Sequence, residues 1–218
     1  MTFEERIILD LCGGTGSWSK PYLEAGYTVH NITLPEYDVR TWTGYKDMKI
    51  HGILAAPPCT MFSFARTNAR LPRDLKQGME TVEACLKIIW YLQYEAVSNT
   101  TKFTRLKFWA LENPYYGLLK NFLGIPVFVF NPYDFGDPYQ KKTALWGNFN
   151  IPKLNPIQLS DEMKRLAKSN SYLHRIGTKF DVLKTRDISP ENYGKLSWQV
   201  RRSITPRGFA NAFFKANP

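Results

Sequence analysis

The stretch Arg6-Ile-Ile-Leu-Asp-Leu11 runs directly into Cys12-Gly-Gly-Thr-Gly-Ser-Trp-Ser19. The first part is a short apolar run ending in an acid, which is typical of a buried parallel strand. The glycines that follow allow a tight turn with little side-chain bulk, and residues 20–25 before Gly26 have the pattern of a short helix. A strand, a glycine-rich turn and a helix indicate a Rossmann-like α/β fold, in which a nucleotide-like ligand can approach the turn.

The same alternation continues along the chain. Apolar and β-branched runs predict further strands at 27–34, 51–55, 108–111, 127–131 and 143–149. Apolar residues recurring every three or four positions predict one long helix at 74–97. This alternation favours a mainly parallel, doubly wound sheet covered on both faces. We expect a core over 1–149, a small basic insertion over 150–202 and a C-terminal segment over 203–218 that returns to the core.

The composition limits the class of protein. The chain has 218 residues, of which 44% are hydrophobic and 15% aromatic, so it can bury a real core and is not expected to be mainly disordered. No apolar run is long enough to span a bilayer and the start lacks the layout of a secretory signal, so a cytoplasmic protein is expected. The three cysteines are widely spaced and form neither a disulfide framework nor a metal pair, so no metal is expected.

The charge is unevenly distributed. The chain has 29 Lys and Arg against 19 Asp and Glu, a net charge of +10. Residues 1–139 hold 14 basic and 14 acidic side chains, whereas residues 140–218 hold 15 basic and 5 acidic ones. This asymmetry favours a polyanionic partner such as nucleic acid, although a basic surface without a partner would have the same composition.

Three polar motifs lie at the ends of predicted strands: the glycine turn, Cys59 in Ala55-Ala-Pro-Pro-Cys-Thr-Met-Phe-Ser63, and Glu112 in Leu111-Glu-Asn-Pro114. Ligands of open α/β sheets bind beyond the carboxyl ends of the strands, so we expect the three motifs to gather at one edge. Each also has a purely structural interpretation. A lone cysteine is commonly a small buried hydrophobe, a carboxylate can cap a strand, and a glycine turn can serve the fold alone.

Taken in order, these segments resemble the cytosine-C5 DNA methyltransferases, and among them the short, phage-type branch. Asp10 to Ser19 looks like the family motif that binds S-adenosylmethionine, and Pro58-Cys-Thr-Met-Phe-Ser63 is similar to its Pro-Cys-Gln-x-Phe-Ser nucleophile loop. Glu112-Asn113-Pro114 looks like its Glu-Asn-Val motif. Asp134 to Lys142 resembles the Tyr-Gly-x-Pro-Gln-x-Arg-x-Arg segment, and Ser203 to Phe209 a final motif.

The resemblance implies a class I methyltransferase fold. It also implies transfer of a methyl group from S-adenosylmethionine to C5 of cytosine in DNA, with S-adenosylhomocysteine as product. Cys59 would add to C6 of the base and make C5 nucleophilic, while a protonated Glu112 would stabilise charge at N3. Ser63 would position the backbone beside the nucleophile, and Lys141 or Lys142 would contact the base. The base must first leave the duplex, because C6 cannot be reached within the stack.

The resemblance also assigns binding residues. The cofactor site would be formed by the glycine turn and by residues of three later segments, namely Asp10, Leu11, Cys12, Gly14, Thr15, Gly16, Ser17, Trp18, Thr33, Asp38, Val39 and Pro58. The DNA phosphates would be held by basic side chains of the C-terminal part, namely Lys164, Arg165, Lys168, Arg175, Lys179, Arg201 and Arg202.

The chain departs from the family pattern in several places. Cys12 replaces a phenylalanine, Thr33 replaces the acid that usually ends the second strand, and the lysine pair replaces forked guanidinium groups. The region 150–202 would be a reduced target-recognition region, so sequence recognition is either loose or supplied by a separate partner. Two alternatives stay open: the same fold acting on RNA or a modified pyrimidine, and a catalytically silent nucleic-acid-binding subunit.

Overall fold

The computed structural model describes residues 6–64, 66, 71–95, 106–137, 139, 141–157 and 194–218. Its strands are β1 (Ile7–Leu11), β2 (Thr28–Ile32), β3 (Ile50–Ala55), β4 (Phe108–Pro114), β5 (Phe128–Phe130) and β6 (Thr143–Asn148). Its α-helices are α1 (Lys20–Glu24), α2 (Leu75–Trp90), α4 (Lys120–Leu123), α8 (Trp198–Ser203) and α9 (Arg207–Ala216). Shorter helical turns are η1 (Gly44–Asp47), η2 (Tyr91–Glu95) and η3 (Pro132–Phe135).

The strands form one mixed sheet in the order β2-β1-β3-β4-β6-β5. Strands β2, β1, β3 and β4 run parallel, and β6 runs antiparallel to both of its neighbours. Because β2 lies on one side of β1 and β3 on the other, the chain changes direction across the sheet at β1. The carboxyl ends of β1 and β3 therefore flank the topological switch point, where open α/β sheets bind their ligands.

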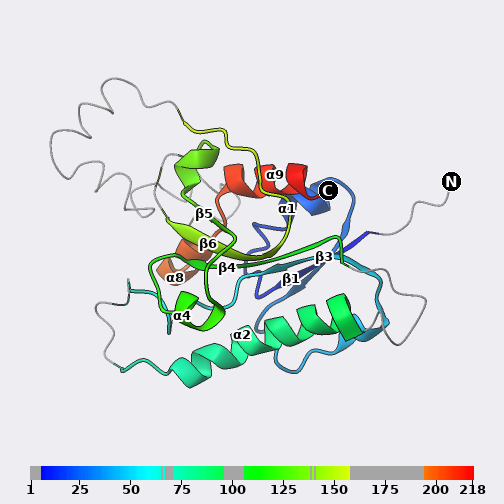
Figure 1. Cartoon of the computed structure of the whole chain (residues 1–218), viewed down its shortest axis with the longest axis horizontal. Coiled ribbons are helices and arrows are strands. Elements are labelled where there is room, and N and C mark those ends of the chain that lie inside the picture. The colour runs from blue at the N-terminus through cyan, green and yellow to red at the C-terminus, as the bar shows by residue number, and fades with distance from the viewer. Residues whose placement is uncertain are drawn as a thin grey trace.

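Helices cover both faces of the sheet, with α2 on one side and α1 and α9 on the other (Figure 1). The alternation of side chains along β1 produces the two cores. Ile7, Leu9 and Leu11 point into the core that contains α2, whereas Ile8 belongs to the core beneath α9. The predicted α/β architecture with both faces covered is thus confirmed.

The sheet is mainly parallel as predicted, with three parallel and two antiparallel strand pairs. One prediction about it needs correction, because β4 continues to Pro114 instead of ending at Leu111. The strand is longer because the antiparallel β6 supplies backbone partners, pairing Glu112 with Leu145 and Asn113 with Ala144. The reversed direction of β6 also brings its first residues to the carboxyl edge of β4.

The long helix ends earlier than predicted. The α-helix stops at Trp90 and continues as the π-helical turn η2 to Glu95, while the last two predicted residues lie outside the described residues. At its start, the Asp74 carboxylate accepts a hydrogen bond of 2.9 Å from the backbone N–H of Gln77. This cap fixes the point at which the chain leaves the carboxyl edge of the sheet.

The C-terminal helix α9 packs against α1 and η3. At its first turn, Gly208 donates its N–H to the Asp137 carboxylate at 2.9 Å. A Cβ on Gly208 would lie 2.0 Å from the carbonyl oxygen of Phe135, so this close approach requires glycine. Within the described ranges, no helix is long and apolar enough to cross a membrane. Residues 158–193, which make up most of the predicted basic insertion, lie outside the described residues.

Candidate active site

The glycine turn after β1 bends through three residues with positive φ: Cys12 at 58°, Gly14 at 55° and Gly16 at 69°. This conformation is uncommon for a residue with a side chain, as at Cys12. Gly13 is needed for a different reason, because a Cβ there would lie 2.3 Å from the carboxyl carbon of Asp10. Sequence reasoning selected Gly14 and Gly16 but missed Gly13, whose signal was its place next to the buried acid of the strand.

Asp10 is fully buried at the end of β1. Ser19 donates its hydroxyl hydrogen to Oδ2 of Asp10 at 2.5 Å, yet burial raises the pKa of the carboxyl from 3.8 to about 6. Across the turn, Asn31 donates from Nδ2 to the carbonyl of Gly14 at 3.1 Å. In the described part of the chain, Oδ1 of Asp10 and Oδ1 of Asn31 have no hydrogen-bond donor. The turn therefore presents two acceptor oxygens that still lack a partner.

Other predicted cofactor residues belong to the core. Leu11 and Val39 are buried in the core on the α2 side. The Trp18 ring is buried on the opposite side and packs against Phe209 and Phe213 of α9, with ring centroids 5.9 and 5.5 Å apart. Trp18 thus joins the turn to α9 and stabilises the position of the turn. Its ring is a core group in this structure, not an open face of the turn.

The remaining predicted cofactor residues are more accessible. The hydroxyl oxygens of Thr15 and Ser17 lie 2.5 Å apart on the turn. Thr33 follows β2 and accepts a backbone hydrogen bond of 3.0 Å from Tyr37. Pro58 is exposed directly before Cys59. These groups line the carboxyl ends of β1, β2 and β3, which form the switch-point edge of the sheet.

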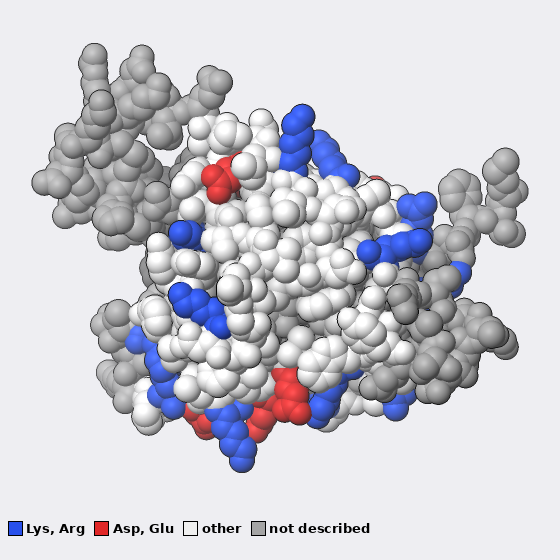
Figure 2. Space-filling model, viewed as in Figure 1, with Lys and Arg blue, Asp and Glu red and all other residues white. Residues whose placement is uncertain are grey.

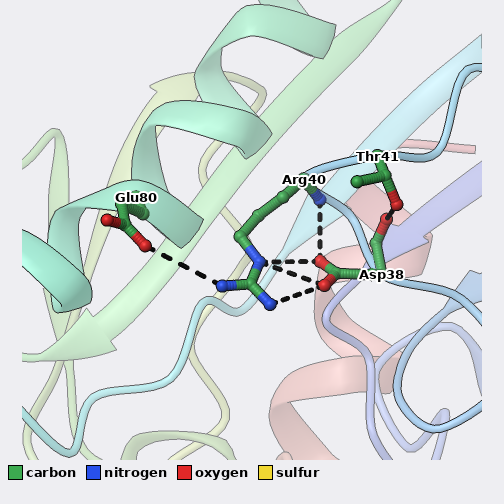
Figure 3. A network of polar contacts seen from close by, with 4 residues as sticks. All are labelled: Asp38, Arg40, Thr41 and Glu80. Carbon is green, nitrogen blue, oxygen red and sulfur yellow. Dashed lines mark hydrogen bonds and ion pairs between the residues drawn. The ribbon is translucent and has the colours of Figure 1, made fainter.

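The carboxylate of Asp38 points toward the guanidinium of Arg40 (Figure 3). Arg40 donates from Nε at 2.9 Å and from Nη2 at 2.6 Å, and its Nη1 lies 3.8 Å from the carboxylate of Glu80 on α2. The hydrogen bonds from Arg40 lower the pKa of Asp38 to about 2. Contact between Asp38 and a cofactor would therefore require the carboxylate to be shared with the guanidinium.

The buried Asp10 predicts an unusual dependence of stability on pH. Between about pH 4 and pH 6 the unfolded chain has lost the Asp10 proton while the folded chain keeps it, so the contribution of Asp10 to the free energy of unfolding falls as pH rises. In Asp10→Asn this fall is absent. Urea unfolding at about pH 3 and pH 7 should show the variant gaining about 3 kcal/mol relative to wild type between the two. An equal difference at both pH values would contradict the burial of a titrating carboxyl. Asp38→Asn is the control of opposite sign, because the pKa of Asp38 is lowered.

The Cys59 loop is held by the end of β4. Asn113 is buried and donates from Nδ2 to the carbonyl of Pro57 at 3.0 Å. The carbonyl of Cys59 then accepts from the N–H groups of Phe62 at 2.9 Å and Ser63 at 2.8 Å, which closes a helical turn. The Glu-Asn motif thus contributes a structural anchor as well as a carboxylate, because the asparagine fixes the residues just before the thiol.

A second anchor was not found from the sequence. The guanidinium of Arg73 donates to the carbonyls of Met61 at 2.9 Å and Ser63 at 2.8 Å. Ser63 also forms an isolated antiparallel bridge with Gly117, just beyond β4. The turn that begins at Cys59 is therefore tied to two other segments through its backbone. A single arginine in a polar stretch gives no sequence signal for such a role.

Three charged side chains act on the half-buried thiol of Cys59. Burial and the carboxylate of Glu112 raise the pKa of the thiol, while the cations of Lys141 and Arg202 lower it. Burial likewise raises the pKa of Glu112, and Lys141 opposes this shift. The structure thus brings together a thiol, a carboxyl that tends to keep its proton, and two cations.

The two neighbouring lysines have different surroundings. Lys141 donates from Nζ to the carbonyl of Ile204 at 3.3 Å and is the lysine whose charge acts on the thiol and the carboxyl. Lys142 lies over the rings of Tyr115 and Tyr116. Successive side chains of an extended segment point in opposite directions, which separates the pair. Lys141 is therefore the one placed at the thiol.

The end of α8 completes the site from a distant part of the sequence. Ser203 places its hydroxyl oxygen 4.0 Å from the position of a Cβ on Gly14. Arg202 acts on the thiol of Cys59, and Ile204 accepts from Lys141. Of the predicted phosphate-binding residues, Arg201 and Arg202 are thus on a helix that borders the site. The other five, Lys164, Arg165, Lys168, Arg175 and Lys179, lie outside the described residues.

The excess of basic over acidic side chains in the C-terminal part lies mainly in two of its segments. Residues 141–157 and 194–218 hold eight basic and no acidic side chains, whereas residues 158–193 hold seven basic and five acidic ones. On the face shown in Figure 2, the blue side chains are spread over the face and its margins rather than gathered in one patch. Most of the net charge therefore belongs to the segments around β6, α8 and α9.

Comparison of the chain with protein-family models found no match, and comparison with curated proteins found none either. The chemistry of the site therefore has to be inferred from its own residues.

Proposed function

We propose that the protein transfers a methyl group from S-adenosylmethionine to C5 of cytosine in DNA. The observation that carries this proposal is the grouping of Cys59, Glu112 and Lys141 at one edge of the sheet. The glycine turn follows β1, which pairs directly with β3, the strand that leads into the Cys59 loop. A nucleophile, an acid and a cation next to a nucleotide-type turn match the needs of pyrimidine C5 methylation.

The residues at the switch point fit S-adenosylmethionine. The positive φ angles of the turn and the absence of side chains at Gly14 and Gly16 leave backbone groups open to a ligand. The unpaired oxygens of Asp10 and Asn31 need hydrogen-bond donors, and the ammonium and ribose hydroxyl groups of the cofactor are such donors. When bound, the cofactor would supply an electrophilic methyl group on a sulfonium sulfur, which C5 of the activated base attacks, with S-adenosylhomocysteine as the leaving group.

Cys59 makes the base carbon reactive. Its thiolate forms a bond to C6, the C5–C6 double bond opens, and the electron pair becomes available at C5. After C5 has been methylated, C5 gives its proton to a water molecule and the C6–sulfur bond breaks, which restores the C5–C6 double bond and releases Cys59 as the thiolate. Burial works against the thiolate, so the nearby charges of Lys141 and Arg202 are needed to favour it.

Glu112 serves as the acid. Thiolate addition places negative charge on the ring, and a proton held at N3 by a carboxylic acid stabilises it. The raised pKa of Glu112 favours the protonated form that this role requires. A carboxyl with an ordinary pKa would be ionised near neutral pH and would repel the charge that develops on the ring.

A second candidate is a nucleic-acid-binding subunit without catalytic activity. It is favoured by the pairing of Asp38 with Arg40, which occupies a carboxylate expected to contact the cofactor. The high pKa of the Cys59 thiol points the same way, because few molecules carry the thiolate near neutral pH.

Calorimetry with S-adenosylmethionine separates the two candidates. The methyltransferase proposal predicts measurable binding by wild type and equal binding by Cys59→Ala, because Cys59 does not hold the cofactor. Radiolabelled methyl transfer to duplex DNA, single-stranded DNA and tRNA, compared side by side, then identifies the acceptor. No binding of S-adenosylmethionine by the wild-type protein would favour the silent subunit, and transfer to tRNA alone would replace DNA by RNA.

A further inference from the structure

A patch of aromatic and basic side chains borders the site without taking part in the chemistry above. It consists of Phe64, Tyr115, Tyr116, Lys120 and Lys142 and is called the tyrosine–lysine patch. Tyr116 is 58% exposed and Phe64 is 51% exposed. The rings of Tyr115 and Tyr116 meet edge to face, with centroids 5.4 Å apart and an angle of 76° between their planes. Large exposed rings next to a reactive site indicate a surface that binds a ligand.

The two lysines of the patch are held on the aromatic rings. Nζ of Lys142 lies 4.6 Å from the ring centroid of Tyr115 and 5.6 Å from that of Tyr116. Nζ of Lys120 lies 4.7 Å from the ring centroid of Tyr115. These cation–π contacts fix two positive charges beside the exposed ring of Tyr116. The patch thus combines a flat apolar surface with cations at a set distance from it.

The patch is connected to the reactive residues through the backbone. Phe64 donates its N–H to the carbonyl of Tyr116 at 3.1 Å, directly after the turn that begins at Cys59. Tyr115 donates its N–H to the carbonyl of Lys142 at 2.9 Å and stands three positions after Glu112. If the target base of a DNA strand reached Cys59, the neighbouring nucleotide of that DNA strand would therefore lie over this patch.

We propose that the tyrosine–lysine patch binds single-stranded DNA, with a base next to the target stacked on Tyr116 and Phe64 and its phosphate held by Lys120 and Lys142. Aromatic side chains bind bases through their faces, and lysines bind the backbone. In a duplex both faces of each base are covered by its neighbours, so this mode selects single-stranded or opened DNA. The position of the base relative to the target rests on the proposed function, whereas the stacking itself does not.

The test measures the binding of a fluorescein-labelled single strand of about 12 nucleotides, and of the matching duplex, by anisotropy without cofactor. Tyr116→Ala should weaken single-strand binding about tenfold, and Tyr116→Phe should restore it because phenylalanine also stacks. Duplex binding should change less than about twofold in both variants. Lys120→Gln should reduce the slope of log affinity against log salt by about 0.7. Trp90→Ala is the matched control, with a ring 46% exposed at the far end of α2, and should bind like wild type.

An abasic strand shows whether a base is responsible. Removing one base should weaken binding by wild type at a single position and have no effect there on Tyr116→Ala. Unchanged binding by Tyr116→Ala, equal loss for single strand and duplex, or preference for RNA over DNA would overturn the proposal. A failure of the proposed function can be told apart from a failure of the stacking proposal. In the first case wild type transfers no methyl group, but its binding of single-stranded DNA still depends on Tyr116. Thermal unfolding of each variant verifies that it is folded.

Discussion

Replacing Cys59 by alanine should abolish methyl transfer to DNA, with a loss of at least about 1000-fold in rate. Without addition at C6, the C5 carbon of cytosine is too weak a nucleophile to attack the methyl group of S-adenosylmethionine. Serine at this position should be almost as inactive, because its hydroxyl holds its proton far more tightly than a thiol does. The rate is measured as radiolabelled methyl incorporated into DNA per folded molecule.

The other cysteines provide a matched control. Cys85 lies buried on α2 with its Sγ 4.0 Å from that of Cys12. Cys85→Ala should lose some stability through the cavity it leaves, yet keep its rate per folded molecule. Methyl transfer that survives in Cys59→Ala at a wild-type rate would mean that the reaction does not pass through this thiol.

Replacing Glu112 by glutamine should lower the rate by about 100- to 10,000-fold, the usual range for loss of a general acid. Glutamine has nearly the same size and leaves the backbone pairing of β4 with β6 intact. S-adenosylmethionine affinity should therefore be unchanged while the catalytic rate falls. A loss of S-adenosylmethionine binding with an unchanged catalytic rate would contradict the acid role, because it would show that Glu112 acts in cofactor binding.

The methyl-transfer rate of wild type and that of Glu112→Gln should also depend differently on pH. Active wild type needs Glu112 protonated and Cys59 ionised, and burial raises both pKa values. As pH rises, the rate should increase up to the pKa of Glu112. It should then level off, because further ionisation of the thiol is matched by loss of the acid proton. In Glu112→Gln the second effect is gone, so the lower rate should keep rising until the pKa of Cys59. A plateau in both proteins would show that another group loses the proton.

The elements with a strong periodic pattern could be predicted from the sequence. The apolar run before the glycines marks β1, and the three- and four-residue spacing marks α2. The direction of β6 could not be predicted, because an apolar run has the same pattern whichever way it is inserted into a sheet. The antiparallel pairing with β6 also lengthens β4. The position of Glu112 inside a strand therefore could not be predicted either.

The reactive residues of the candidate site were selected from the sequence, but their supports were not. Cys59 and Glu112 stand out because polar residues follow apolar runs at predicted strand ends. The choice between Lys141 and Lys142 depends on which face of the chain meets α8, and that contact is set by packing across more than 60 residues. Ser19 donates a hydrogen bond to the carboxylate of Asp10, and Arg73 donates one to a backbone carbonyl. The residue types alone do not indicate either partner.

The proposed covalent step can be observed directly with DNA in which the target cytosine carries fluorine at C5. After thiolate addition and methylation, the base must lose a substituent from C5 as a cation before the sulfur can leave. A proton departs readily, whereas fluorine cannot leave as a cation, so the adduct stays closed. Incubation with S-adenosylmethionine and this DNA, followed by digestion and mass spectrometry, should yield the peptide containing Cys59 joined to a methylated fluorocytosine. Methylation of ordinary cytosine by the same preparation with no such adduct, or with an adduct on any other residue, would contradict the account.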